Sequence, residues 1–200
     1  GENAMPITIE EVDAHFKELG YKVMLPDDPE RKKVNRQLIF NTKRYCNAEG
    51  ENSVVISIYL EPSGEYIELV APRAYNVREC KNKGPVFAAL LEIAYKTRNQ
   101  NFEYDPSDGE IRVASDLPIE DGSITQLQLD ALLGAIIFTL DKFHLVIQHV
   151  IETGRIDLSL ANEPDSDKSV GDPETAELVA KLGGIEGLRK LVASIGGEPS

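Results

Sequence analysis

A hairpin followed by one long apolar helix, within residues 102–154, constrains the fold of this chain more than any other part of its sequence. Alternating apolar residues between Phe102 and Asp116 flank Asp105-Pro106-Ser107-Asp108-Gly109, a run rich in turn-forming residues. Apolar residues then recur at helical spacing from Ser123 to Thr153, and Gly154 is a natural stop. This pairing predicts that the rest of the chain is organised around a hairpin and a largely buried helix.

The apolar residues of the predicted helix cover more than one narrow stripe of its surface. They are Leu129, Leu132, Leu133, Ile136, Ile137, Leu140, Phe143, Ile147, Val150 and Ile151. A sheet can shield only one side of a helix, so we expect a second surface, either a subunit or a client segment, to cover the other side. At the start of the helix, Ser123 and Gln126 fit a capping box.

The same periodicities predict the remaining elements. Residues 7–19 form a helix with a capping box at Thr8 and Glu11. Residues 84–98 form a second helix that Gly84 and Pro85 open, with the proline at the first helical position. Alternation predicts strands over 37–45, 53–60 and 65–71, joined as an antiparallel meander. The fold class is therefore α+β, with about five antiparallel strands in the order α-β-β-β-α-β-β-α and helices covering the sheet.

Composition divides the chain into three parts. We expect an α+β domain over residues 5–160, an acidic linker over 161–173 that contains Pro, Ser and Gly, and a short C-terminal helical segment over 174–200. The apolar face of the last segment is too small to fold alone. It therefore has to dock elsewhere or stay mobile, and a tail that covers the partner surface is one hypothesis.

The net charge of −13 is unevenly distributed, since residues 1–98 hold 14 basic and 15 acidic side chains and residues 99–200 hold 7 and 19. The acidic half would repel phosphate backbones, so we expect no nucleic-acid partner. Two basic clusters stand in the first half. They are Arg31, Lys32, Lys33 and Arg36, and Arg73, Arg78, Lys81 and Lys83. Both can be solvated loops, or they can form a docking surface for an acidic partner.

The sequence also predicts where the chain works. Its longest apolar run, Ala131 to Leu140, is about half of what a bilayer span needs, so we expect no membrane insertion. Two cysteines, Cys46 and Cys80, are too few for a disulfide framework, and no glycosylation sequon occurs. These features predict a cytoplasmic protein with reduced thiols.

The only residues with a spacing suited to chemistry lie on the long helix. Asp141 with His144, and His149 with Glu152, stand three residues apart, a spacing at which carboxylate and imidazole can hold a metal ion. However, positions 144 and 149 are about 140° apart around a helix, so the four groups cannot converge from one helix. We predict no catalytic residue, no metal and no cofactor. The alternative is a small-molecule- or metal-binding enzyme that uses the His144 and His149 region.

Aromatic and basic side chains near the meander and on the long helix are the candidate partner-binding residues. They are Tyr59, Tyr66, Arg73, Arg78, Lys81, Lys83, Phe143 and Ile147. Tyrosine gives contact area with a polar tip and is common at interfaces. For the two tyrosines, a half-buried place on a strand is the equal alternative.

The order of elements carries a resemblance to a known family. Together with Phe102-Glu103-Tyr104, Asp108-Gly109-Glu110-Ile111-Arg112-Val113, Leu117-Pro118 and Asp121-Gly122, it resembles the YbjN-type family, whose members are described as candidate bacterial sensory transduction regulators. That family is similar in fold to type III secretion chaperones, which are often dimers that bind client segments. The resemblance covers residues 7–154 and implies a non-enzymatic, protein-binding or chaperone-like regulator that acts as a homodimer.

Overall fold

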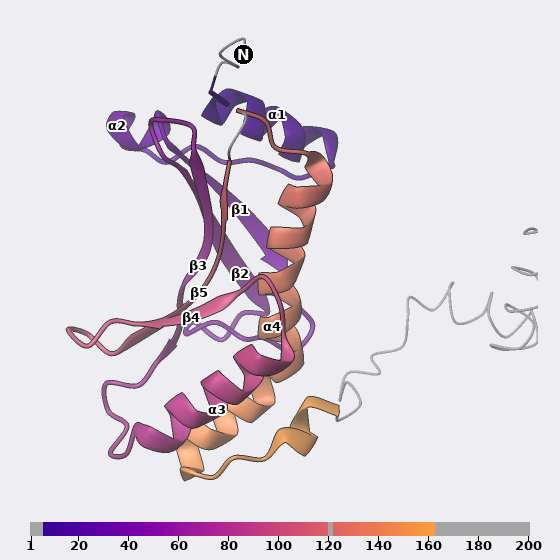
Figure 1. Ribbon diagram of the computed structural model, residues 1–200. Helices are drawn as coiled ribbons and strands as arrows, with labels where there is room; N and C mark the ends of the chain where they lie inside the picture. Colours follow the sequence, from indigo (N-terminus) through magenta and orange to yellow (C-terminus); the bar gives the residue numbers. More distant parts are fainter. Residues whose placement is uncertain (1–5, 120–121, 163–200) are drawn as a thin grey trace, which may run out of the picture. The chain divides into compact units, whose positions relative to one another are not determined.

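The computed structural model describes residues 6–119 and 122–162, and it contains five helical segments and five strands in these ranges (Figure 1). The expected linker and C-terminal segment lie, apart from residues 161 and 162, outside the described residues. In chain order, the elements are α1 (Ile9–Glu18), α2 (Pro29–Lys32), β1 (Asn35–Asn41), β2 (Ser53–Leu60), β3 (Tyr66–Asn76), α3 (Gly84–Lys96), β4 (Asn101–Tyr104), β5 (Glu110–Pro118), α4 (Gln126–Thr153) and the 3-10 turn η1 (Leu158–Asn162).

The five strands form one antiparallel sheet in the order β1-β2-β3-β5-β4. The predicted α+β class and the order of the main elements are therefore confirmed. The short helix α2 and the turn η1 were not predicted from the sequence, because each is about one turn long and has no apolar periodicity to reveal it. The capping box at Thr8 and Glu11 is present as expected.

The long helix begins two residues later than the sequence indicated. Thr125, not Ser123, is the N-cap: its hydroxyl accepts the Gln128 N–H at 3.2 Å, and the Gln128 side chain accepts the Thr125 N–H at 2.8 Å. Ser123 with Gln126 and Thr125 with Gln128 have the same capping pattern, and the burial of neighbouring residues distinguishes them. A cap at Thr125 places the buried Ile124 before the helix and the buried Leu129 in its first turns, which is the arrangement of a hydrophobic staple. The predicted stop at Gly154, in the left-handed conformation with φ 71°, is confirmed.

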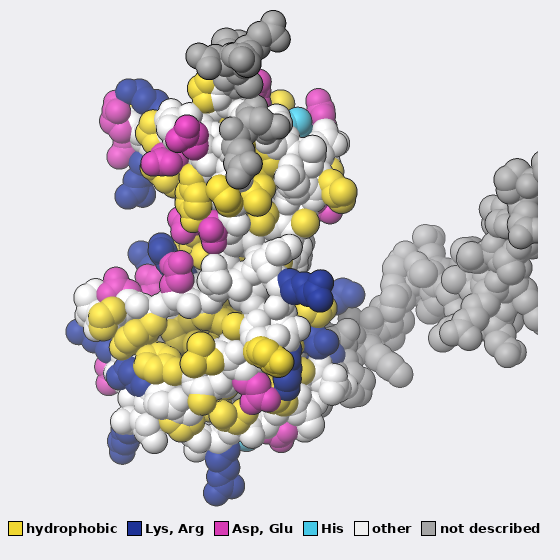
Figure 2. Space-filling model, viewed as in Figure 1, with side chains coloured by type: hydrophobic (Ala, Val, Ile, Leu, Met, Phe, Trp, Pro, Cys, Tyr) yellow, Lys and Arg dark blue, Asp and Glu magenta, His cyan; other side chains and the backbone are white. Residues whose placement is uncertain are grey.

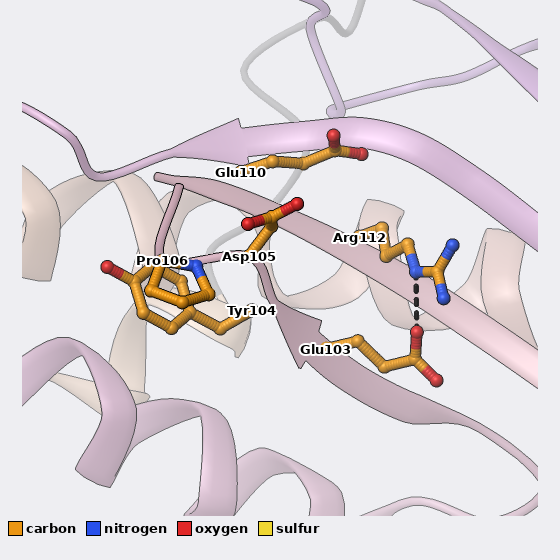
Figure 3. Close-up of a pocket in the computed structure, with 6 residues that line it drawn as sticks. All are labelled: Glu103, Tyr104, Asp105, Pro106, Glu110 and Arg112. Carbon is orange, nitrogen blue, oxygen red and sulfur yellow. Dashed lines mark hydrogen bonds and ion pairs between the residues drawn. The ribbon is translucent and has the colours of Figure 1, made fainter. Parts of the chain in front are cut away.

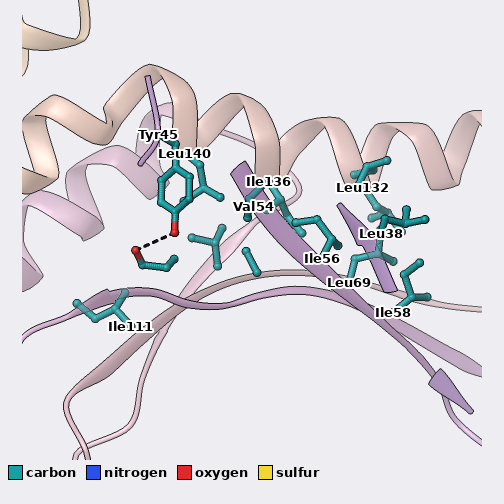
Figure 4. Packing of buried hydrophobic residues seen from close by; sticks show 14 of the residues in the cluster. Leu38, Tyr45, Val54, Ile56, Ile58, Leu69, Ile111, Leu132, Ile136 and Leu140 are labelled. Atoms are coloured by element: carbon teal, nitrogen blue, oxygen red, sulfur yellow. Dashed lines mark hydrogen bonds between the residues drawn. The ribbon is translucent and has the colours of Figure 1, made fainter. Parts of the chain in front are cut away.

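The core lies between α4 and one face of the sheet. Figure 4 shows Leu132, Ile136 and Leu140 of α4 directed at strand residues such as Ile56 and Leu69. α1 and α3 pack on the same side of the sheet (Figure 1). In the described ranges, no helix is long and apolar enough to cross a membrane.

The chain itself covers the apolar residues that the sequence analysis assigned to a partner. Eight of the ten are buried, and Ile137 and Ile151 are partly buried against the same core. α3 and η1 supply the second covering surface, because both pack on α4 beside the sheet. The expectation that another polypeptide has to shield these ten residues is therefore wrong.

Helices α1, α3 and α4 leave the opposite face of the sheet open. Two of its residues, Val70 and Ala114, form a cross-strand pair and are buried, yet they lie outside the main core cluster. Around them, the side chains are largely polar and partly exposed, and Ile39 on β1 is 54% exposed. An antiparallel sheet with one solvated face fits this pattern.

Candidate partner-binding surfaces

An apolar groove lies between helix α3 and the edge strand β4, and we call it the α3–β4 groove. Its volume is about 310 Å³, and its walls are Phe87, Leu90, Leu91, Ala94, Asn101, Phe102, Glu103 and Tyr104. The rings of Phe87 and Tyr104 pack across it with centroids 4.9 Å apart. Leu91 is 72% exposed and Tyr95, one turn further along α3, is 90% exposed. Figure 2 shows hydrophobic side chains gathered over this part of the molecule.

The strand that borders this groove has an unpaired edge. β4 is only four residues long and stands at the end of the sheet, and in the described ranges it pairs with β5 alone. An edge strand presents backbone N–H and C=O groups that can pair with another chain. Apolar side chains and free backbone groups are thus available side by side.

A second cavity, of about 320 Å³, lies on the β4–β5 hairpin and is polar. Figure 3 shows Arg112 in an ion pair with Glu103, with Asp105 and Glu110 nearby. Hydrogen bonds from Ser107 hold the pKa of the Asp105 carboxyl below its ordinary value. Arg112 therefore neutralises only one of three carboxylates, so the cavity keeps an acidic character that disfavours anionic ligands.

The basic residues named from the sequence do not form one surface. Arg78 and Lys81 are exposed in the segment before α3, and the Lys83 ammonium donates to the Cys80 carbonyl at 3.4 Å. Arg73 stands apart from these three, on β3, and lines two cavities of about 420 and 490 Å³.

Two of the apolar candidates are not on a surface at all. Phe143 is 5% exposed and Ile147 is fully buried, so both belong to the core between α4 and its neighbours. Tyr59 and Tyr66 are half-buried on the open face of the sheet, which agrees with the alternative given for them. Burial raises the pKa of Tyr66 to about 12, and the nearby Asp116 carboxylate adds to this shift.

Two of the polar residues of α4 that the sequence marked as candidates for metal binding, Asp141 and His144, make contacts within the fold. His144 is buried, its Nδ1 lies 3.4 Å from the Tyr75 hydroxyl, and burial lowers its pKa. The Asp141 carboxylate accepts three backbone N–H groups, from Lys43, Arg44 and Tyr45. Asp141 is therefore engaged by the loop after β1. Within residues 6–119 and 122–162, no three His, Cys, Asp or Glu side chains are placed to hold a metal ion.

One apolar stripe of α4 remains in solvent, and we call it the α4 outer stripe. It consists of Leu127 (78% exposed), Phe138 (54%) and Leu145 (36%), with the exposed small residues Ala131 and Gly134 between the first two. The spacings of three and four residues place them on one side of the helix. The sequence did not reveal this stripe, because apolar residues occur on several sides of the same helix and their spacing does not show which of them are exposed.

No protein-family model matches the chain, and no curated protein does either. The chain is similar to several solved structures, and two of them are as follows. One, of the HopA1–SchA chaperone–effector complex, contains a chain with 9% identity and a TM-score of 0.41, over 68% of this chain and 95% of that chain. The other is YbjN, a proposed transcription regulator from E. coli, with 13% identity and a TM-score of 0.47, over 72% of this chain and 92% of that chain. Both are of the kinds that the sequence resembled.

Proposed function

We propose that this chain is a non-enzymatic, chaperone-like protein-binding module that holds an extended apolar segment of another protein in the α3–β4 groove. The observation that carries the proposal is the placement of exposed apolar side chains beside an unpaired strand edge. A cytoplasmic location belongs to the same proposal, and the two half-buried free thiols, Cys46 and Cys80, suit it.

An extended segment fits this surface better than a helix does. A strand added to the outer edge of β4 would gain backbone hydrogen bonds, and its alternate side chains would face α3. There they would meet Leu91 and the Phe87 ring, which line the groove. The backbone bonds supply affinity that depends little on sequence, whereas the apolar wall selects Val, Ile or Leu at alternate positions.

Replacing Leu91 with aspartate is expected to weaken binding of such a segment at least tenfold. The reason is that burying a leucine side chain contributes about 1.5–3 kcal/mol, and an aspartate in its place would need to lose water as well. The probe is a fluorescent seven-residue peptide in which valine and threonine alternate, and the measurement is its anisotropy on titration with the protein.

The matched control is Leu25→Asp, because Leu25 is also apolar and 55% exposed but lines none of the cavities described here. This variant should bind the peptide as the wild type does. If the wild type does not bind the peptide, or if both variants weaken binding equally, the groove is not the binding surface.

We also infer that the module acts as a homodimer through the α4 outer stripe. Gly134 supports this, because a Cβ added there would meet nothing within 4 Å. The fold itself therefore does not require a glycine at this position, although glycine inside a helix costs about 1 kcal/mol relative to alanine. A second copy of α4 crossing at Gly134 and Ala131 would approach closely and bury Phe138 of both copies.

Phe138→Asp is expected to raise the dimer dissociation constant at least a hundredfold. The substitution removes two buried aromatic rings, one from each copy, and each contributes about 2–3 kcal/mol. Sedimentation equilibrium over a range of protein concentrations measures the change. Ile39→Asp, at an equally exposed apolar residue on the sheet, should leave the constant unchanged. A wild-type chain that sediments as a monomer at about 100 µM would rule the dimer out.

A further inference from the structure

The largest of the described cavities lies on the side of the sheet that faces away from α4. Its volume is about 490 Å³, and we call it the sheet cleft. Its floor includes Val55 and Ser57 on β2 and Gln37 on β1, and Gln37 and Ser57 are cross-strand partners. Arg31 from α2 and Arg73 from β3 also line it, so residues from three separate parts of the chain meet at one cleft.

The backbone at Arg73 adopts a conformation that few residues other than glycine adopt. Its φ is +52°, and it lies where the pairing of β3 with β5 shifts register between Ala71 and Tyr75. The Arg73 N–H donates to the Glu110 carboxylate at 2.8 Å, which fixes this bulge. A left-handed conformation costs a non-glycine residue about 1 kcal/mol or more, and bulges commonly redirect a side chain at functional sites. The residue with the strained backbone, Arg73, is therefore the same residue that lines the cleft with a guanidinium.

The guanidiniums of the two arginines at the cleft are not engaged by the part of the chain that the structure describes. Among the residues that the structure describes, neither the Arg31 nor the Arg73 guanidinium has an ion-pair partner. In contrast, Arg36 pairs with Glu10 and Asp13, and Arg112 pairs with Glu103. The side chains of Gln37 and Ser57 also make no hydrogen bond within the described ranges. As far as residues 6–119 and 122–162 are concerned, the cleft thus offers a ligand two guanidiniums, an amide and a hydroxyl that have no other partner.

The net charge of the cleft is positive although the chain is strongly acidic. Among the described residues that line it, Glu49 is the one acidic residue, against two arginines. Arginine recognises carboxylate and phosphate groups through paired N–H donors. A long polyanion would meet the repulsion of a chain with a net charge of −13, whereas a small anion responds mainly to the local charges.

We propose that the sheet cleft binds a small organic molecule that carries an oxyanion, either a phosphate monoester or a carboxylate. Arg31 and Arg73 bind the anionic group, and Gln37 and Ser57 hydrogen-bond to polar atoms next to it. Val55, which is 39% exposed, and Pro72 contact the organic part. The volume lies within the range of about 300–1,000 Å³ that is common for ligand sites. The site is independent of the α3–β4 groove, so the two proposals can fail separately.

Isothermal titration calorimetry at about 20 mM salt tests the proposal with three probes: inorganic phosphate, glycerol 3-phosphate and citrate. We expect saturable binding of at least one probe in the millimolar range or tighter. Arg31→Gln and Arg73→Gly should each weaken that binding at least tenfold, since each removes one charged donor group. A preference for glycerol 3-phosphate over citrate would assign the ligand to the phosphate esters, and the reverse preference would assign it to the carboxylates.

Two measurements keep this test decisive. Arg78→Gln removes the same charge from an exposed residue that does not line the cleft, and it should change the affinity less than twofold. Arg73→Gly should melt no lower than the wild type, because glycine tolerates the positive φ without strain. The proposal is overturned if no probe binds up to about 10 mM, if Arg31→Gln and Arg73→Gly bind like the wild type, or if Arg78→Gln loses as much affinity as they do.

Discussion

Replacing Asp141 with alanine is expected to lower the free energy of unfolding by about 3 kcal/mol, since hydrogen bonds to a charged group contribute about 1.5–3 kcal/mol each and some of the freed N–H groups can bind water instead. The Asp141 carboxylate accepts the N–H groups of Lys43, Arg44 and Tyr45, with N···O distances of 3.0, 3.1 and 3.1 Å. No other interaction in the described residues joins α4 to the loop after β1 through a comparable set of bonds.

The loss is measured by urea unfolding and by the melting temperature, which should fall by roughly 6–12 °C for a chain of this size. Glu152→Ala is the matched control: it removes a carboxylate from the same helix at an exposed position near its C-terminus. It should change the free energy of unfolding by less than about 0.5 kcal/mol. An Asp141→Ala variant that unfolds within 1 kcal/mol of the wild type would contradict this account of the loop.

Asp141 also supports the proposed ligand site, because the loop that it holds forms part of that site. The loop that it holds places Tyr45 in the core, where the hydroxyl donates to the Ala74 carbonyl at 3.2 Å. The same loop supplies Asn47 and Glu49 to the wall of the sheet cleft. Asp141→Ala should therefore weaken anion binding although the residue lies outside the cleft.

The elements of the fold were predictable because their signals are local. Strand β2 alternates apolar and polar residues and was located to the residue, and the capping box at Thr8 marks the start of α1. Thr125 shows the limit of such signals, since Ser123 offers an equivalent pattern two residues earlier. The choice between them depends on the burial of Ile124, which only the packed structure reveals.

The candidate surfaces were less predictable because they depend on how distant elements meet. The apolar pattern at Phe143 and Ile147 is the same for a residue buried by α3 and for a residue buried by a partner. That α3 packs on α4 could not be predicted from the sequence pattern. Leu91 is an apolar residue of α3, yet it is 72% exposed beside the edge strand β4, and this exposure is visible only once α3 and β4 are placed together. The position of Arg73 at the sheet cleft depends on a bulge that no sequence pattern marks.

Arg36 is the clearest case of a residue whose role the sequence did not reveal. It belongs to the first basic cluster, which the sequence analysis interpreted as a solvated loop or a docking surface. In the structure, however, Arg36 is only 4% exposed. Its guanidinium donates to the Lys32 and Asn35 carbonyls at 2.6 and 2.9 Å. It also pairs with Asp13 and Glu10 on α1 at 3.4 and 3.3 Å. Arg36 thus ties the α2–β1 junction to the first helix.

Arg36→Leu is therefore expected to lower the free energy of unfolding by about 3 kcal/mol, at the low end of the 3–5 kcal/mol that removing one member of a buried ion pair costs, because Asp13 keeps its second partner, the Lys17 ammonium at 3.0 Å. Urea unfolding measures the change. Lys33→Leu provides the control, since the Lys33 ammonium pairs with Glu30 at 2.8 Å with both side chains exposed, and such pairs contribute at most about 1 kcal/mol.

The double variant Arg36→Leu with Asp13→Leu separates the ion pair from simple packing. Replacing both members of a buried pair with apolar side chains is often nearly neutral, so the second substitution should restore part of the lost stability. Recovery should remain incomplete, because the Lys32 and Asn35 carbonyls still lack the donor that Arg36 supplied. Asp13→Leu also removes the pair with the exposed Lys17 ammonium, which contributes at most about 1 kcal/mol. If the double variant is less stable than Arg36→Leu alone by more than this amount, the buried ion pair is not the cause of the loss.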